Sequence, residues 1–333
     1  MPQPTFTFAS GTYDRLKHLH NGNILVEGCN IAPVIMKPEL IFPRALLRQE
    51  FDITEMSASS YLMQTARGDS QHIAIPVFIS RAFRHRCIYI RKDRGIRTPK
   101  DLEGKRLGVP EYQTTVSLWL RGILQDYYDV DISSIRYRNG GLNDPGRKER
   151  LPLDLPDKMD VEQIASNQTL SGLLEAGDLD AVIGPNPPSC FVQRSPYVKR
   201  MFEDYPRNEA EYFRDTGFFP IMHMIAIRKQ VVEQHSWLPE ALFRAFCEAK
   251  KRAFEEIGEA ARRPANATVL PWLLAELERT EEIMGRDYWK YGVDPNRAEL
   301  ETLCRYSHEQ HLAPRRLSVE ELFAPQTLEL FEQ

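Results

Sequence analysis

Hydrophobic and polar positions alternate along the first two thirds of the chain in a way that predicts strands and helices in turn. Apolar runs of strand length lie at residues 5–9, 51–53, 73–79, 87–90, 104–110, 180–184 and 222–227. Segments with helical spacing follow several of these runs. Strands that alternate with helices are typical of an α/β protein with mostly parallel sheets.

The expected helices are marked by their apolar faces and by their ends. Thr12 is a plausible N-cap for a helix over 13–20, and Thr98 with Pro99 opens a short helix. Further helices are expected at 57–66, 114–127 and 170–174, with a polar loop over 139–160. Beyond Leu238 the chain is almost entirely helical in pattern, above all at 241–257 and 267–284.

The order of these elements indicates two lobes. A single core usually stops growing at about 250–300 residues, and the chain has 333. We expect a discontinuous first lobe formed by 1–103 and 218–333, with the C-terminal helices, and a second lobe, 104–217, inserted into it. Ligands of such sheets bind beyond the carboxyl ends of the strands, here in a cleft between the lobes.

Composition and charge exclude several classes of protein. The net charge is −4, which gives no support to a nucleic-acid partner, and no apolar run approaches the ~20 residues that span a bilayer. The N-terminus shows no secretory signal, so we expect a cytoplasmic protein. The five cysteines are widely spread without a C-x-x-C pair, which argues against a disulfide framework or a zinc ribbon.

A basic segment supplies the first candidate chemistry. Residues 81–106 contain ten lysines and arginines against three acids. Arg81 and Arg84 follow a strand directly, and arginine forks match carboxylates, so we expect them to bind a carboxylated substrate. His85, which directly follows Arg84, is a candidate acid or base, although a structural histidine is about as plausible.

A second candidate site begins at Glu111, where a strand passes into a helix. Thr114 and Thr115 with free backbone N–H groups could cradle an anion, whereas ordinary N-capping needs only one of them. Trp119 could flank an aromatic ligand, but core packing is the commoner fate of a tryptophan. His223 on an apolar strand is a second acid/base candidate or a core residue. Other polar side chains after strands could line the same cleft: Tyr13, Asp14, Ser59, Ser60 and Asn186.

Metal and nucleotide chemistry find little support. Cys304, His308 and His311 have helical spacing, but an exposed helix face explains them better than a metal site. The dinucleotide, P-loop, zincin and nucleophile-elbow motifs are absent. We therefore expect neither a metal nor a cofactor.

Several motifs spread over nearly the whole chain resemble the 4,5-dihydroxyphthalate decarboxylases, a family related to type II periplasmic binding proteins. The segments R-x-F-R-H (81–85) and F-F-P-I-M-H (218–223) are the more specific ones, while P-x-D-L-x-G-K (99–105) identifies only the fold. The remaining matches are 11–14, 76–80, 95–98, 108–112, 119–122 and 320–325. The resemblance implies a two-lobed type II periplasmic-binding-protein-like fold.

The resemblance also implies a reaction, the non-oxidative decarboxylation of an aromatic dicarboxylate. The expected substrate is 4,5-dihydroxyphthalate and the product 3,4-dihydroxybenzoate (protocatechuate), as in phthalate catabolism. Such chemistry needs carboxylate anchors, an acid and a base. We expect His85 and His223 to be the acid and base, with Asp14 or Glu111 orienting a histidine or holding a catechol hydroxyl.

The alternative is a non-catalytic solute-binding protein for aromatic carboxylates on the same fold. In either case the expected partner is a small aromatic carboxylate rather than a nucleic acid or a membrane. The helical C-terminal third could supply an interface between identical copies.

Overall fold

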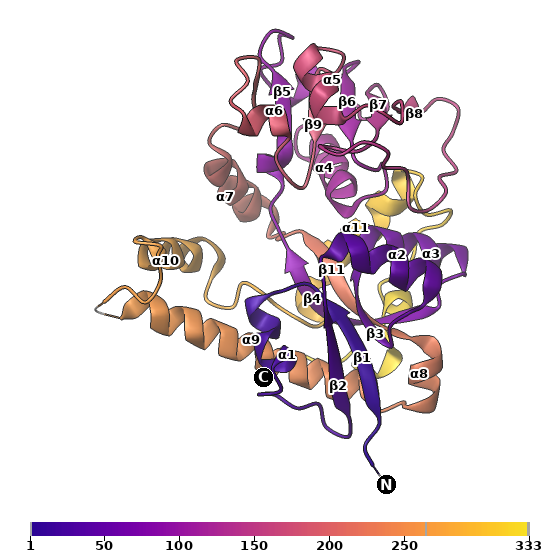
Figure 1. Ribbon diagram of the computed structural model, residues 1–333, viewed down its shortest axis with the longest axis vertical. Helices are drawn as coiled ribbons and strands as arrows, with labels where there is room; N and C mark the ends of the chain where they lie inside the picture. Colours follow the sequence, from indigo (N-terminus) through magenta and orange to yellow (C-terminus); the bar gives the residue numbers. More distant parts are fainter. Residues whose placement is uncertain (1, 264, 332–333) are drawn as a thin grey trace. The chain divides into compact units, whose positions relative to one another are not determined.

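The computed structural model describes residues 2–263 and 265–331, which divide into two compact units. The first unit comprises 1–81, 223–301 and 317–333, and the second comprises 82–222 and 302–316. Each unit is built on its own sheet, with helices packed on it (Figure 1). Within the described residues, no helix is both long and apolar enough to cross a membrane.

The sheet of the first unit has the order β2-β1-β3-β11-β4. β1 lies parallel to β2 and β3, and β11 runs antiparallel to β3. The strands are β1 (Thr5–Ser10), β2 (Asn30–Ile35), β3 (Ile53–Ser57), β4 (His72–Arg81) and β11 (Ile221–Arg228).

Helices cover this first sheet and join its strands. α2 and α3 contact β3, while α9 contacts β4 and the segment 14–20 (Figure 1). Phe246 of α9 meets Phe8 of β1 edge to face, with ring centroids 5.5 Å apart. The helices are α1 (Lys17–His20), α2 (Pro38–Arg48), α3 (Ala58–Arg67), α8 (Lys229–Gln234), α9 (Leu238–Arg262) and α10 (Leu273–Met284).

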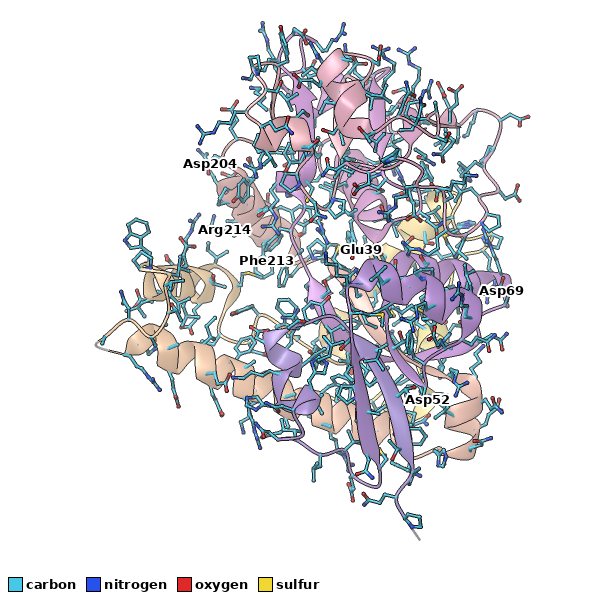
Figure 2. All side chains as sticks on the ribbon, viewed as in Figure 1. Glu39, Asp52, Asp69, Asp204, Phe213 and Arg214 are labelled. Atoms are coloured by element: carbon cyan, nitrogen blue, oxygen red, sulfur yellow. The ribbon has the colours of Figure 1, made fainter. Side chains whose placement is uncertain are left out.

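Asp52 ties three strands of the first sheet together just before β3 begins (Figure 2). Its Oδ2 accepts hydrogen bonds from the backbone N of Thr7 at 2.9 Å and from Oγ1 of Thr7 at 2.8 Å. Arg228 at the end of β11 pairs with the other oxygen. Burial alone would raise the pKa of Asp52, but these donors lower it, so the carboxylate is held ionised.

The sheet of the second unit has the order β10-β5-β9-β6-β7-β8. β6 lies parallel to β7 and β9, β7 lies parallel to β8, and β5 runs antiparallel to both β9 and β10. The strands are β5 (Ile88–Arg91), β6 (Arg106–Val109), β7 (Arg136–Asn139), β8 (Val161–Gln163), β9 (Ala181–Ile183) and β10 (Val198–Arg200). The helices are α4 (Thr115–Asp126), α5 (Leu170–Ala176), α6 (Ser189–Val192), α7 (Tyr205–Thr216) and the end of α11 (Arg297–Glu309).

The α/β class and most of the expected elements are confirmed. The strand predicted at 51–53 lies instead at 53–57, and the helix predicted at 267–284 begins only at Leu273, because Pro271 disfavours helical backbone in the residue before it. Thr12 does not cap a helix, since a 3-10 turn begins at Asp14. Thr98 does form a capping box with Asp101.

The units differ from the predicted lobes at their boundaries. Residues 82–103 group with the second unit, where β5 pairs with β9 and β10. Residues 302–316 join the same unit. Gln310 there accepts a hydrogen bond from Nε of Arg121 at 2.7 Å, and Tyr306 packs on Gly122 so closely that a Cβ would lie 2.1 Å from its ring.

Candidate active site

Glu55 is the centre of a polar network in the first unit. Its side chain is fully buried, and it accepts hydrogen bonds from the backbone N of Gly11 at 2.7 Å and from the hydroxyl of Tyr13 at 2.5 Å. Nδ1 of His223 lies 2.6 Å from Oε1. Burial alone would raise the pKa of Glu55, but His223, Tyr13 and Gly11 together lower it. The carboxylate is therefore ionised at neutral pH.

Strand register explains why these residues meet. Ser57 is paired with His223 and Glu55 with Ile225 in the antiparallel ladder of β3 and β11, so Glu55 and His223 are diagonal neighbours on one face. β1 lies parallel to β3 and ends at Ser10, which brings Gly11 and Tyr13 to the same edge. This edge is where the parallel strands end, the usual position of ligand sites in open α/β sheets.

His223 combines a fixed orientation with partial exposure. Because Glu55 is ionised, Nδ1 of His223 carries a proton and donates a hydrogen bond to the carboxylate. The ring of Phe42 meets the imidazole edge to face at 5.0 Å, and 18% of the histidine side chain is exposed. Within the described residues, Nε2 has no protein partner, so this nitrogen can exchange a proton with a ligand.

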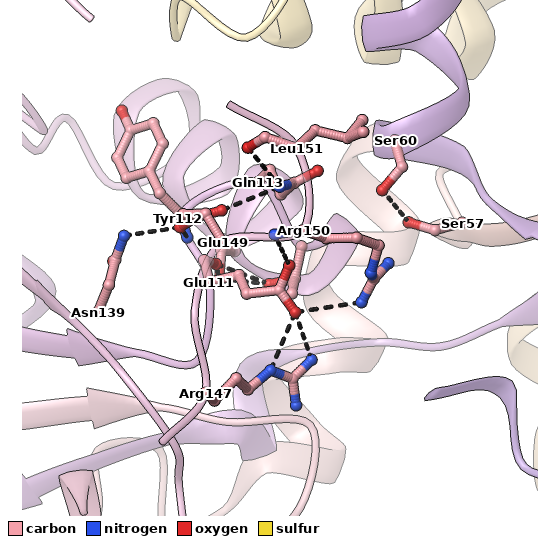
Figure 3. A network of polar contacts seen from close by, with 12 residues as sticks. Ser57, Ser60, Glu111, Tyr112, Gln113, Asn139, Arg147, Glu149, Arg150 and Leu151 are labelled. Atoms are coloured by element: carbon pink, nitrogen blue, oxygen red, sulfur yellow. Dashed lines mark hydrogen bonds and ion pairs between the residues drawn. The ribbon is translucent and has the colours of Figure 1, made fainter. Parts of the chain in front are cut away.

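A second network surrounds Glu111 in the second unit (Figure 3). Its side chain is 3% exposed, and Oε1 accepts hydrogen bonds from Nε and Nη2 of Arg147 at 2.9 and 2.6 Å. Nη2 of Arg150 donates to the same oxygen at 3.1 Å, and the backbone N of Arg150 donates to Oε2 at 3.1 Å. Two guanidinium groups therefore converge on one buried carboxylate.

Glu149 lies beside this arginine pair and accepts neutral donors. Nε2 of Gln113 donates to it at 3.0 Å, Nδ2 of Asn139 at 2.6 Å, and the backbone N of Tyr112 also donates (Figure 3). Burial is the main reason that the pKa of Glu149 is raised, and the nearby charge of Glu111 adds to it.

Of the predicted site residues, the structure brings Tyr13 and His223 together on Glu55. Asp14 is exposed and pairs with Arg15 at 2.9 Å. Glu111 contacts arginines and no histidine in the described residues. The catalytic roles expected for Asp14 and Glu111 stay predictions. The residue that orients a histidine is Glu55, which sequence reasoning missed.

The arginines expected to bind carboxylates have different surroundings. Arg81 is buried, donates to Glu299 at 3.1 Å and to the carbonyl of Lys290 at 3.0 Å, and also contacts Asn296. Arg84 is half-buried, and its hydrogen-bond acceptors among the described side chains are sulfur atoms, with Nε 3.0 Å from Sδ of Met222. The substrate role of both stays a prediction, but only Arg84 keeps donors for a ligand.

His85 lies in an aromatic cluster of the second unit. Its ring is 1% exposed and lies 5.0 Å from Phe202, 5.4 Å from Tyr212 and 5.9 Å from Tyr128. Neither ring nitrogen has a hydrogen-bond partner among the described residues. Burial lowers the pKa of His85 to about 4, so it is neutral at physiological pH. Its role as acid or base stays a prediction.

The other candidates are mostly engaged within the protein. Trp119 is fully buried, donates to the carbonyl of Ile221 at 2.8 Å and packs on Tyr306, which is the core packing weighed above. Thr114 hydrogen-bonds with Ser117 at 2.7 Å. Three further candidates are buried, Ser59, Ser60 and Thr115, and one is exposed, Asn186.

Cys304, His308 and His311, which have helical spacing in the sequence, do not form a cluster of metal ligands among the described residues. Nδ1 of His308 lies 3.1 Å from the carbonyl of Ala313, and His311 follows the helix with a φ of 59°. In the described part of the chain, no three histidine, cysteine or acidic side chains are placed to hold a metal ion.

Comparison with known proteins identifies the family. No protein-family model matches the chain. The chain is 41% identical over 332 residues to a 4,5-dihydroxyphthalate decarboxylase of Comamonas testosteroni, covering 100% of both chains. It is 43% identical over 218 residues to a protein of the same name from Pseudomonas putida, covering 66% of this chain and 84% of that one.

Among solved structures, the chain is similar to the periplasmic aliphatic sulphonate binding protein SsuA of Escherichia coli. The TM-score is 0.54 at 12% identity, covering 98% of this chain and 99% of that one. This likeness shows the fold and not the ligand. The chain thus has the fold of the type II periplasmic binding proteins, and by its full-length similarity it belongs to the 4,5-dihydroxyphthalate decarboxylase family.

Proposed function

We propose that this protein catalyses the non-oxidative decarboxylation of 4,5-dihydroxyphthalate to 3,4-dihydroxybenzoate and CO2. The full-length similarity to the Comamonas testosteroni decarboxylase supports the reaction. The alternative of a solute-binding protein without activity is not favoured, since both curated relatives are decarboxylases. The hydrogen bond between His223 and Glu55 is the observation that carries our assignment of the proton-transferring residue.

The reaction requires a proton at a ring carbon. The hydroxyl para to the departing carboxylate pushes electron density onto the carbon that bears this group, and an acid protonates that carbon. The bond to the carboxylate then breaks, its electron pair returns to the ring, and CO2 leaves as aromaticity is restored. The net change is the uptake of one proton and the loss of one CO2.

We assign the proton transfer to Nε2 of His223. Glu55 holds Nδ1 at 2.6 Å, so the ring keeps one orientation while Nε2 donates a proton to the ring carbon. A positioned acid or base contributes typically about 10²–10⁴-fold in rate. Glu55 acts through His223 and is a positioning residue, and Tyr13 and Gly11 keep it ionised. We retain Arg84 as an anchor for a substrate carboxylate.

The test is to incubate the purified, chelator-treated protein with 4,5-dihydroxyphthalate in D2O. We expect CO2 and 3,4-dihydroxybenzoate with one ring deuterium, at the carbon that lost its carboxylate. His223→Asn should lower kcat by about 10²–10⁴, while the control His308→Asn, at an exposed histidine, should leave it unchanged. Saturable binding without turnover in the wild type would instead favour the solute-binding alternative.

A cytoplasmic location and a place in phthalate catabolism belong to the same proposal. Cys29, Cys87 and Cys190 are buried as thiols, which is usual in a reducing compartment. Cell fractionation with an antibody against the protein tests the location, and growth of a deletion strain on phthalate tests the metabolic role.

A further inference from the structure

A groove in the second unit lies outside both networks described above. Its first part has a volume of about 720 Å³ and its second part a volume of about 490 Å³, sizes that are typical of small-molecule sites. Lys92 and Phe191 line both parts, so the two parts adjoin. All the lining residues belong to the second unit.

The groove is separate from the Glu111 network. Lys92 follows the end of β5, which runs antiparallel to β9. β9 lies parallel to β6, the strand that precedes Glu111. Lys92 and Glu111 therefore lie at opposite ends of the strands of this sheet. The groove is found in Figure 1 beside β5 and α6, which carries Phe191, and it shares no residue with the Glu111 network.

Positive charge predominates in the first part of the groove. Its cations are Lys92, Arg97, Lys199 and Arg200, and its one acid is Glu203. Glu203 counts as charged, because its ion pair with Lys199 at 2.6 Å lowers its pKa. The side chains of Lys92 and Arg97 are exposed, and neither forms a hydrogen bond or an ion pair with the described part of the chain. Four cations against one carboxylate favour an anion with more than one negative charge.

Arg200 is a half-buried cation among aromatic rings. Its guanidinium carbon lies 4.8 Å from the centre of the Phe191 ring, 5.3 Å from that of Tyr205 and 5.7 Å from that of Tyr89. No carboxylate among the described residues pairs with it, and its buried Nε has no hydrogen-bond partner there. Aromatic rings attract a cation but do not neutralise it, and a cation removed from water without a counter-charge is costly. An anion in the groove would supply that charge.

The second part of the groove is more apolar. Val192 is 65% exposed and lines it together with Pro196 and the half-buried ring of Phe191. Arg194 is the cation that this part adds. A ligand that fits both parts therefore has a multivalent anionic end and a planar or apolar portion.

We propose that this groove binds an organic polyphosphate such as a nucleoside triphosphate. The phosphates pair with Lys92, Lys199 and Arg200, and the organic part packs on Phe191. Lysine binds phosphate as a point charge and arginine binds it in a bidentate manner. The proposal goes beyond the decarboxylation and does not depend on it, because none of the residues that line the groove is assigned to that reaction.

Isothermal titration calorimetry with ATP tests the site. We expect saturable binding that weakens as salt is added, because salt screens exposed charges. Lys92→Gln, at an exposed lysine, should raise the Kd about 2–5-fold. Arg200→Gln, at the half-buried arginine, should raise it about 10–100-fold. Arg214→Gln is the charge-matched control, at an exposed arginine of α7 that does not line the groove (Figure 2), and it should bind ATP as the wild type does.

Glu203→Gln gives a result that a folding defect cannot imitate. The variant removes the carboxylate of the groove and frees Lys199, so the Kd of ATP should fall about 2–5-fold. Asp144→Asn makes the same change of charge at an exposed residue outside the groove and should leave the Kd unaltered. If Arg200→Gln does not fold, as its thermal melting without ligand will show, Glu203→Gln and Lys92→Gln still decide.

Several results would overturn the proposal. One is the absence of saturable binding at millimolar ATP. Another is an equal loss of affinity in Lys92→Gln and Arg214→Gln, which would mean a diffuse attraction to the whole unit rather than a site. A third is an equal affinity for ATP and for inorganic tripolyphosphate, which would mean that the organic part makes no contact with Phe191.

Discussion

Glu55 binds Nδ1 of His223 at 2.6 Å, which leaves Nε2 as the nitrogen that can exchange a proton. The two residues come from antiparallel strands, two positions apart in register. A buried carboxylate that holds an imidazole in one orientation and tautomer is a recurring arrangement in acid/base catalysis.

Glu55→Gln should lower kcat by about 10² with a small change in KM, because an amide keeps the shape but lacks the negative charge that orients Nδ1 of His223. Steady-state kinetics at pH 7.5 measures this effect. Glu39→Gln, at an exposed glutamate of α2 (Figure 2), is the control and should retain full activity. An unchanged kcat in Glu55→Gln would remove Glu55 from the mechanism.

Tyr13→Phe should lower kcat by about tenfold, the value of one hydrogen bond to a charged group. The variant loses the hydroxyl that donates to Glu55 at 2.5 Å. Tyr197→Phe, at an exposed tyrosine, should behave as the wild type. Equal kcat in both variants would mean that the Tyr13 hydroxyl does not support Glu55.

Gly11→Ala tests the same network from the backbone. A Cβ at this position would lie 3.1 Å from the Tyr13 ring and 3.4 Å from Oε2 of Glu55, so the tyrosine must shift. We expect kcat to fall with little loss of thermal stability, since Gly11 does not have the backbone conformation reserved for glycine. In the double variant with Gly11→Ala and Tyr13→Phe, kcat should fall by less than the product of the two separate fold-changes, because both substitutions act on the same carboxylate.

His85→Phe separates a structural from a catalytic histidine. The pKa of His85 is lowered to about 4 by burial, whereas the unfolded chain takes up this proton near pH 6.5. The unfolded state therefore binds more protons between these values, and stability falls as the pH drops through this window. The variant should lose less stability than the wild type between pH 7 and 5.

Urea unfolding at the two pH values measures that difference. His72, whose pKa is also lowered to about 4, chiefly by burial, will leave part of the acid sensitivity in place. We expect kcat of His85→Phe to match the wild type at pH 7.5. A loss of 10²-fold or more would instead support His85 as the acid or base.

Arg81→Met should destabilise the protein by about 3–5 kcal/mol, because it removes the guanidinium group that pairs with the buried carboxylate of Glu299 at 3.1 Å. Adding Glu299→Gln should recover part of this loss. Urea unfolding gives the stability and steady-state kinetics gives KM. A raised KM in a variant of unchanged stability would favour the substrate role that the sequence suggested for Arg81.

Local patterns were enough to predict much of the secondary structure, and the failures have local causes. β2 and α2 were not expected, and both contain an interior proline, Pro33 and Pro43. β4 was expected although it contains Pro76, because its apolar run is longer. Pro33 and Pro76 lie on the two edge strands of the first sheet, where a missing N–H is tolerated.

The sequence by itself determined the α/β class, the family resemblance and the choice of His223 and Tyr13 as candidates. These depend on short-range spacing and on motifs. Only the tertiary structure decided which side chains contact His223 and Tyr13. Glu55 is one acid within a strand and lies 168 positions before His223, so nothing local marks it as a partner.

For the same reason, the sequence did not predict that Arg147 and Arg150 would contact Glu111. They lie in a polar segment that the pattern describes only as a loop, 36 and 39 positions after Glu111. Strand register and the parallel direction of β6 and β7 bring them together. Long-range pairing of this kind depends on the packing of whole sheets, which no local pattern of residues encodes.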